Sequence, residues 1–152
     1  MPGELIGQLP GAVLFACNFN QVRSPMAEAL TRFLFGKSIQ VASAGLRPGE
    51  PDGFAIAVMD EAGMDIFRHT PKGFEDLGDF DFDLIVTLSP EAHHRALELS
   101  RDKQVEVEYW PTLDATHIEG ARDQKLDAYR AVRDGLLKRI KQRFDWRAFG
   151  SL

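Results

Sequence analysis

The chain has 152 residues, of which 44% are apolar and 27% are charged, a composition typical of one globular domain. These values exclude a disordered chain, a coiled coil and a disulfide-stapled miniprotein. The net charge is −5, which argues against broad binding to nucleic acid or to an anionic membrane. Neither is therefore expected as a partner.

The start of the chain carries no recognisable targeting signal. Residues 1–10 contain Glu4 and no Lys or Arg, and they lack the apolar core of a signal peptide. The apolar run Ala12–Cys17 is six residues long, far short of the ~20 that a membrane helix needs. We expect one domain over residues 1–152 with a flexible or weakly structured segment 1–10, and a cytoplasmic location.

The first elements are readable from apolar runs and helix-start signals. Ala12–Cys17 is continuously apolar and predicts a strand buried on both faces. A polar loop over residues 18–23 follows. Ser24 and Pro25 then predict a helix start, with Ser24 as the N-cap, and Gly36 ends this helix.

Strands and helices alternate along the rest of the chain. In order, we predict a strand at 39–43, a helix at 52–62, a short helix at 71–77, a strand at 83–88, a helix at 90–100 and an edge strand at 105–110. After a loop over 111–121, the last helix carries an apolar stripe of Leu126, Tyr129, Val132, Leu136, Ile140 and Phe144. This order predicts an α/β three-layer sandwich with a parallel sheet. Ligands of such folds bind beyond the carboxyl ends of the strands, where Cys17 lies.

Cys17 is the only cysteine of the chain, so it is either an apolar filler or a reactive thiol. One cysteine supplies too few ligands for a structural zinc site, and no metal or cofactor is expected. The loop after Cys17 feeds a helix start, where successive N–H groups and the helix dipole form an anion site. Arg23 adds a planar fork for two oxygens, and this positive field stabilises a thiolate. Ser24 can donate a hydrogen bond to the sulfur, so the pattern favours a nucleophile.

Residues 13–29, VLFACNFNQVRSPMAEA, resemble the signature of the low-molecular-weight protein tyrosine phosphatase family, which arsenate reductases of the same fold share. The likeness continues in residues 43–45, in residues 61–65 followed by His69, and in residues 110–114. The resemblance implies a central four-stranded parallel sheet of order 2-1-3-4 flanked by helices.

The resemblance also implies a mechanism. Cys17 attacks phosphorus to form a phosphocysteine, Arg23 and the loop amides hold the oxygens, and Asp114 protonates the leaving group. The phosphate-binding residues are Asn18, Phe19, Asn20, Gln21, Val22, Arg23 and Ser24. The residues of a supporting network are Asn20, Ser24, Ser43 and His69.

Three positions depart from the family pattern. Phe19 stands where glycine is common, Val22 where many members have a second cysteine, and Ala115 where proline normally follows the acid. The last difference leaves the placement of Asp114 open. The rival carboxylates are those of Asp79, Asp81 and Asp83.

Three functions follow from these observations. The leading hypothesis is a cysteine-dependent phosphomonoesterase of the protein tyrosine phosphatase type, whose partner is a phosphorylated protein, a small aryl phosphate or another tetrahedral oxyanion. The aromatic slot for a phosphotyrosine ring is not evident, although Phe19 or Phe54 could line one. The alternatives are an arsenate reductase that uses an external low-molecular-weight thiol and a catalytically weak phosphate- or phosphopeptide-binding module. We expect a monomer or a weak dimer.

Overall fold

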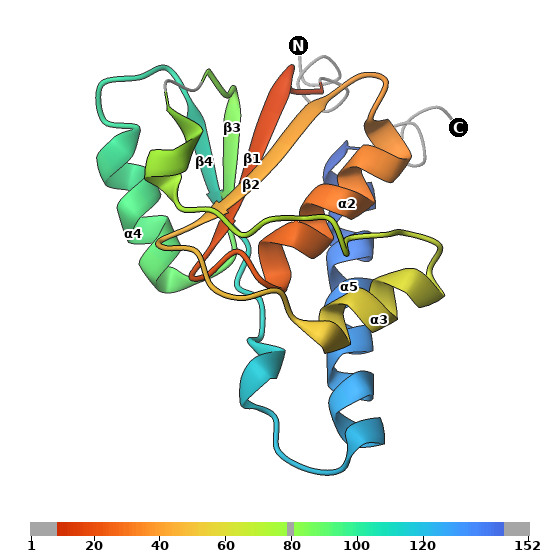
Figure 1. Ribbon diagram of the computed structural model, residues 1–152. Coiled ribbons are helices and arrows are strands. Elements are labelled where there is room, and N and C mark those ends of the chain that lie inside the picture. The colour runs from red at the N-terminus through yellow and green to blue at the C-terminus, as the bar shows by residue number, and fades with distance from the viewer. Residues whose placement is uncertain (1–8, 79–80, 145–152) are drawn as a thin grey trace.

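The fold is that of a computed structural model, which describes residues 9–78 and 81–144 (Figure 1). Most of the segment predicted to be weakly structured, and the rival carboxylate Asp79, lie outside the described residues.

The elements alternate as the sequence predicts. They are β1 (Ala12–Cys17), α2 (Arg23–Phe35), β2 (Gln40–Gly45), α3 (Gly53–Glu61), the 3-10 helix η1 (Phe74–Leu77), β3 (Leu84–Thr87), α4 (Pro90–Leu99), β4 (Glu106–Tyr109), the 3-10 helix η2 (Ala115–His117) and α5 (Arg122–Phe144). The four strands pair in parallel in the order β2-β1-β3-β4. This order confirms the predicted sheet and places β4 at an edge.

Strand β1 lies inside the sheet because its six residues are all apolar and all buried. In its register, Cys17 lies beside Gly45 of β2 and Ala16 beside Thr87 of β3. The carboxyl ends of parallel strands meet at one edge of a sheet. Cys17 ends β1 at this edge, so the loop that follows it lies where such folds bind ligands.

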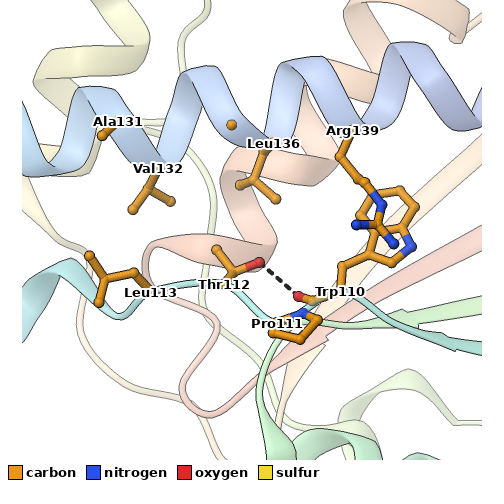
Figure 2. Close-up of a pocket in the computed structure, with 9 residues that line it drawn as sticks. Trp110, Pro111, Thr112, Leu113, Ala131, Val132, Leu136 and Arg139 are labelled. Carbon is orange, nitrogen blue, oxygen red and sulfur yellow. Dashed lines mark hydrogen bonds between the residues drawn. The ribbon is translucent and has the colours of Figure 1, made fainter.

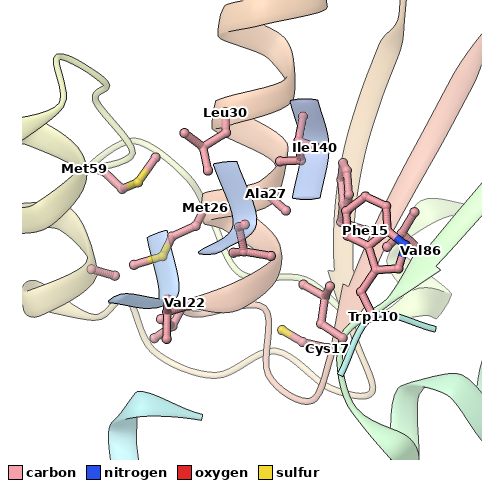
Figure 3. Packing of buried hydrophobic residues seen from close by; sticks show 14 of the residues in the cluster. Phe15, Cys17, Val22, Met26, Ala27, Leu30, Met59, Val86, Trp110 and Ile140 are labelled. Atoms are coloured by element: carbon pink, nitrogen blue, oxygen red, sulfur yellow. The ribbon is translucent and has the colours of Figure 1, made fainter. Parts of the chain in front are cut away.

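Helices cover both faces of the sheet and give three layers (Figure 1). On one face, Phe15 and Val86 pack against Met26 and Leu30 of α2 and against Ile140 of α5 (Figure 3). The opposite face, under α4 and η1, carries a smaller cluster of Leu14, Ala16, Ala44, Phe74, Ile85, Ala92 and Ala96. Within the part of the chain that the structure describes, no helix combines the length and the apolar character that a membrane crossing requires.

Two details differ from the predicted elements, whereas the apolar stripe of the last helix is confirmed as buried in full. Helix α2 begins at Arg23, with Val22 as its N-cap and without a side-chain cap. Ser24 is therefore not the cap, because its hydroxyl bonds to Cys17 and Asn20 instead. The second difference is the short helix η2, which lies inside the stretch predicted to be a loop and begins directly after Asp114.

Candidate active site

The loop from Cys17 to Ser24, here called the phosphate loop, joins β1 to α2 and brings its two ends together. The Cys17 Sγ lies 2.9 Å from the Ser24 Oγ, and both side chains are buried. The Ser24 Oγ accepts a hydrogen bond of 2.8 Å from the Asn20 Nδ2. Because that oxygen is already an acceptor, its own hydrogen can point at the sulfur, as a thiolate requires.

Asn20 holds the phosphate loop from within. Its φ of 56° is the only positive φ of a non-glycine residue among the described residues, and asparagine tolerates this left-handed conformation better than most residues. Its Nδ2 donates to the Ser43 Oγ at 2.9 Å as well as to Ser24. Its Oδ1 accepts from the Lys72 backbone N–H at 3.0 Å and from the His69 Nε2 at 2.9 Å. The structure thus brings together all four residues predicted to form a supporting network.

Glu28, to which no sequence pattern gives a role, completes this network. It accepts a hydrogen bond from the Ser43 Oγ, and its other oxygen lies 2.6 Å from the Arg32 Nη2. Its carboxylate also lies 3.8 Å from the His69 Nδ1. Burial lowers the pKa of His69; although Glu28 opposes this effect, the net shift is downward. A neutral His69 that donates through its Nε2 suits the contact with Asn20.

The segment from Gly45 to Glu50 lies along the outside of the phosphate loop. Its backbone N–H groups donate to three consecutive loop carbonyls, namely Leu46 to Cys17, Arg47 to Asn18 and Gly49 to Phe19. A Cβ at Gly45 would lie 2.8 Å from the backbone of Asn18 and of Asn20. Glycine is therefore required here for close backbone approach, and this requirement explains the Ser-Ala-Gly match.

Arg23 is buried despite its charge, with 7% of its surface exposed. Its Nη1 donates to the Thr112 carbonyl at 3.1 Å, and its Nη2 lies 3.7 Å from the Asp114 Oδ2. The guanidinium therefore joins the phosphate loop to the stretch from Thr112 to Ile118, here called the acid loop.

Asp114 caps η2 through the Asp114 Oδ1, which accepts from the Thr116 N–H at 3.0 Å and from the Thr116 Oγ1 at 2.6 Å. Partial burial raises the pKa of Asp114, but the Thr116 hydrogen bonds and the charges of Arg23 and His117 outweigh it and lower the pKa overall. One small hollow is lined by Cys17, Phe19, Gln21, Val22, Arg23, Asp114 and Thr116. Asp114 therefore shares a hollow with Cys17 even though Ala115 stands in place of proline. Thr116 was not predicted, although an aspartate that bonds the backbone N–H two residues further on is a typical turn signal.

The rival carboxylates of Asp81 and Asp83 lie away from Cys17, and of the two aromatic candidates only Phe19 lines its hollow. Asp81 and Asp83 precede β3 and lie at the opposite edge of the sheet from Cys17, where the Asp83 carboxylate accepts from the Gly11 backbone N–H. Phe19 lines the hollow, with the Arg47 guanidinium 5.3 Å from its ring centre. Phe54 instead packs on Tyr129.

Over residues 9–78 and 81–144, no three His, Cys, Asp or Glu side chains gather as a metal site would require.

A second, apolar hollow lies between the start of the acid loop and α5 (Figure 2) and has a volume of about 270 Å³. Its wall includes Trp110, Leu113 and Leu136, and the Arg139 guanidinium covers the Trp110 ring at 5.2 Å. Gly135 of α5 also lines this hollow, and a Cβ there would meet no atom within 4 Å. We call it the α5 groove. It shares no lining residue with the hollow of Cys17.

A phosphate loop after the first strand of a 2-1-3-4 sheet, with an arginine at its end and a carboxylate opposite, defines a class of thiol enzymes for tetrahedral oxyanions. The family model of low molecular weight phosphotyrosine protein phosphatases matches residues 12–146 of this chain. The protein therefore belongs to that family.

Curated relatives of similar length carry another name. The glutaredoxin arsenate reductase of Synechocystis sp. is 30% identical over 129 residues, which cover 85% of this chain and 92% of the relative. The arsenate reductase of Bacillus licheniformis is 31% identical over 134 residues, with 86% and 92% covered.

Solved structures agree on the fold. A tyrosine phosphatase of Erwinia amylovora, amsI, superposes with a TM-score of 0.73 at 22% identity, over 90% of this chain and 92% of its own. An arsenate reductase in its phosphate-binding state gives a TM-score of 0.65 at 28% identity, over 86% and 93%. This chain is thus similar to proteins of both names, and its chemistry has to be argued from its own residues.

Proposed function

We propose that the protein is a cysteine-dependent phosphomonoesterase that acts on a phosphorylated protein side chain or a small aryl phosphate. The Cys17 thiolate attacks phosphorus, and the bond from phosphorus to the ester oxygen breaks as a phosphocysteine forms. Asp114 gives its proton to the departing oxygen and then takes a proton from the water that releases phosphate. Arg23 and the loop N–H groups hold the oxygens that carry the negative charge.

The observation that carries this proposal is the shared hollow of Cys17, Arg23 and Asp114. The sulfur has a hydrogen-bond donor within 2.9 Å in Ser24, the buried Arg23 lines the same hollow, and the carboxylate lies 3.7 Å from that arginine. Each group that phosphomonoester hydrolysis needs is present, and no second thiol is required.

The pKa of Asp114 is lowered in part by Arg23, whose guanidinium faces the carboxylate and stabilises its charge. A bound phosphate dianion would take up the positive charge of Arg23 and would repel an ionised carboxylate, and both effects raise a carboxyl pKa. Substrate binding is therefore the event that prepares Asp114 to act as an acid.

The names of the curated relatives favour a second candidate, arsenate reduction. In this chemistry Cys17 binds arsenic(V), and an external thiol attacks the sulfur, so that arsenic leaves as arsenic(III) and a mixed disulfide remains. A second external thiol then reduces that disulfide. The external thiols are necessary because Cys17 is the only cysteine of the chain.

One set of kinetic measurements separates these functions. Phenyl phosphate and p-nitrophenyl phosphate are offered to the wild type, Cys17→Ser and Asp114→Asn. We expect Cys17→Ser to lose turnover by at least about 10³-fold and Asp114→Asn to lose about 10²–10⁴-fold on phenyl phosphate. Asp81→Asn is the matched control, since Asp81 lies at the far edge of the sheet, and should retain the wild-type rate.

Normal turnover in Cys17→Ser would overturn the proposal. Phosphate binding without turnover in the wild type would instead indicate a binding module. Arsenate consumption with glutathione, in the absence of ester hydrolysis, would establish the second candidate.

A further inference from the structure

The two oxygens of the Asp114 carboxylate have different surroundings. The Oδ1 accepts two hydrogen bonds from Thr116, one from its hydroxyl at 2.6 Å and one from its backbone N–H at 3.0 Å. The Oδ2 faces the Arg23 Nη2 at 3.7 Å and the His117 Nε2 at 3.3 Å. Only the Oδ2 is thus turned toward the guanidinium that would hold the anion.

This difference decides where a proton can reside. A proton on the Oδ1 would displace a donor of Thr116, because a protonated carboxyl oxygen cannot keep two donors as well as its own hydrogen. A proton on the Oδ2 leaves both Thr116 bonds intact. The acid proton therefore belongs on the oxygen that faces Arg23, which is the side from which an ester oxygen would leave.

We propose that Thr116 is a positioning residue that turns the Asp114 carboxyl so that its proton is carried on the Oδ2. The inference rests on the proposed phosphatase function and deepens it. It assigns to a hydroxyl the task that a proline after the acid performs in relatives with the Asp-Pro pattern, because Ala115 leaves the backbone of the acid loop without that constraint.

Other groups near Asp114 do not explain the arrangement. The His117 side chain is 82% exposed, and a solvent-exposed ion pair is too weak to fix the orientation of the carboxyl. Tyr129 of α5 is close enough to interact with the charge of Asp114, but its hydroxyl donates to the Asp52 Oδ2 at 2.8 Å. Arg23 touches only the Oδ2. Within residues 9–78 and 81–144, only Thr116 donates to the Oδ1.

The test compares Thr116→Val, which keeps the branched shape and loses the hydroxyl, with Thr116→Ser, which keeps the hydroxyl. The first readout is the pKa of the Asp114 carboxyl, followed by ¹³C NMR titration and assigned from the signal that Asp114→Asn removes. A donor to the ionised form lowers a carboxyl pKa, so Thr116→Val should raise it and Thr116→Ser should leave it low. This readout needs no turnover.

The second readout is the dependence of kcat/KM on the leaving group. Phenyl phosphate needs protonation of its leaving oxygen more than p-nitrophenyl phosphate does. Thr116→Val should therefore lose about tenfold on phenyl phosphate and less than about threefold on p-nitrophenyl phosphate. Thr116→Ser should keep the wild-type ratio of the two substrates.

The outcomes are distinguishable from failure of the proposed function. A wild type without Cys17-dependent turnover would overturn the phosphatase, while the NMR titration would still test the hydrogen bond. An unchanged pKa and an unchanged substrate ratio in Thr116→Val would overturn the role of Thr116. Thr116→Ser behaving like Thr116→Val would overturn it too, because the methyl group rather than the hydroxyl would then be the important part.

Discussion

The phosphate loop and the acid loop face each other across Cys17, yet different contacts hold them. In the phosphate loop, Asn20 alone makes four hydrogen bonds, to Ser24, Ser43, His69 and Lys72. The exposed fraction of the Asn20, Ser24 and Ser43 side chains is near zero. Buried networks of this kind stabilise one conformation strongly, because breaking one bond leaves its partners unsatisfied.

The acid loop has few such contacts. Thr116 holds one oxygen of Asp114, and Arg23 binds the Thr112 carbonyl. Leu113 between them is 61% exposed, and the α5 groove lies behind it. The loop thus rests on one local turn and on the contacts of Arg23 rather than on a buried network of side chains.

This contrast between the two loops indicates where the chain tolerates substitutions. A substitution in the phosphate loop has to satisfy every partner of Asn20, whereas the acid loop can exchange one local constraint for another. Ala115 and Thr116 fit that expectation, since together they replace a proline with a hydrogen bond. Phe19 varies within the phosphate loop for a different reason, because its φ is not in the left-handed region and its backbone therefore does not require glycine.

The largest effect on stability is expected where the phosphate loop meets β2. Gly45→Ala would place a Cβ 2.8 Å from loop backbone atoms, and backbone cannot move aside as a flexible side chain can. We expect a loss of about 1–3 kcal/mol in the free energy of unfolding and a fall in kcat/KM of at least about tenfold. Urea unfolding and p-nitrophenyl phosphate hydrolysis measure the two effects.

Gly53→Ala is the matched control for that substitution. Gly53 begins α3, and a Cβ there meets no atom within 4 Å, so both quantities should stay near the wild-type values. Equal behaviour of the two alanine variants would contradict the view that the phosphate loop is rigidly packed.

A smaller effect, visible in its pH dependence, is expected at His69. Its pKa in the folded protein lies below the ordinary 6.5, so the unfolded chain binds the proton more readily. Stability should therefore fall as the pH falls below about 6.5, and this loss should be smaller in His69→Gln, which has no proton to bind. Urea unfolding at pH 7 and at pH 5 measures the loss in the free energy of unfolding for the wild type and for His69→Gln.

His94→Gln serves as the comparison for His69→Gln, since the His94 side chain is 81% exposed. It should reproduce the wild-type loss between the two pH values. A wild-type loss that His69→Gln does not reduce would show that the buried network tolerates a charged histidine.

The sequence predicted the contacts between residues that are close together in the chain, and it missed some of the contacts between distant segments. Cys17 and Ser24 lie within one local motif, and the apolar runs on either side determine the elements that carry them. Glu28 lies inside the motif on α2, but its partner Ser43 lies on β2, and only the packing of that helix against the sheet brings the two together, so no local pattern gives Glu28 a role. The resemblance placed Ser43 and His69 in the network, whereas periodicity alone did not.

The misjudged cap of α2 has a similar cause. Ser followed by Pro is a local signal for a helix start, and the same pair at Ser89 and Pro90 caps α4 as predicted. At Ser24 a contact with Cys17 competes for the same hydroxyl. Local signals therefore fail where the site uses the residue for another bond.

The smallest expected effect tests the acid-loop side of the comparison. Gly135 lies in the interior of α5, where glycine is less favourable than alanine by about 0.5–1 kcal/mol, and a Cβ there has open space. Gly135→Ala should raise the free energy of unfolding by about that amount and leave kcat/KM unchanged, because the α5 groove shares no residue with the hollow of Cys17. A gain in stability with a loss of kcat/KM would instead show that the groove must stay open for the acid loop to move. Thr112 would be the connection in that case, since it lines the groove and its carbonyl accepts the hydrogen bond of Arg23.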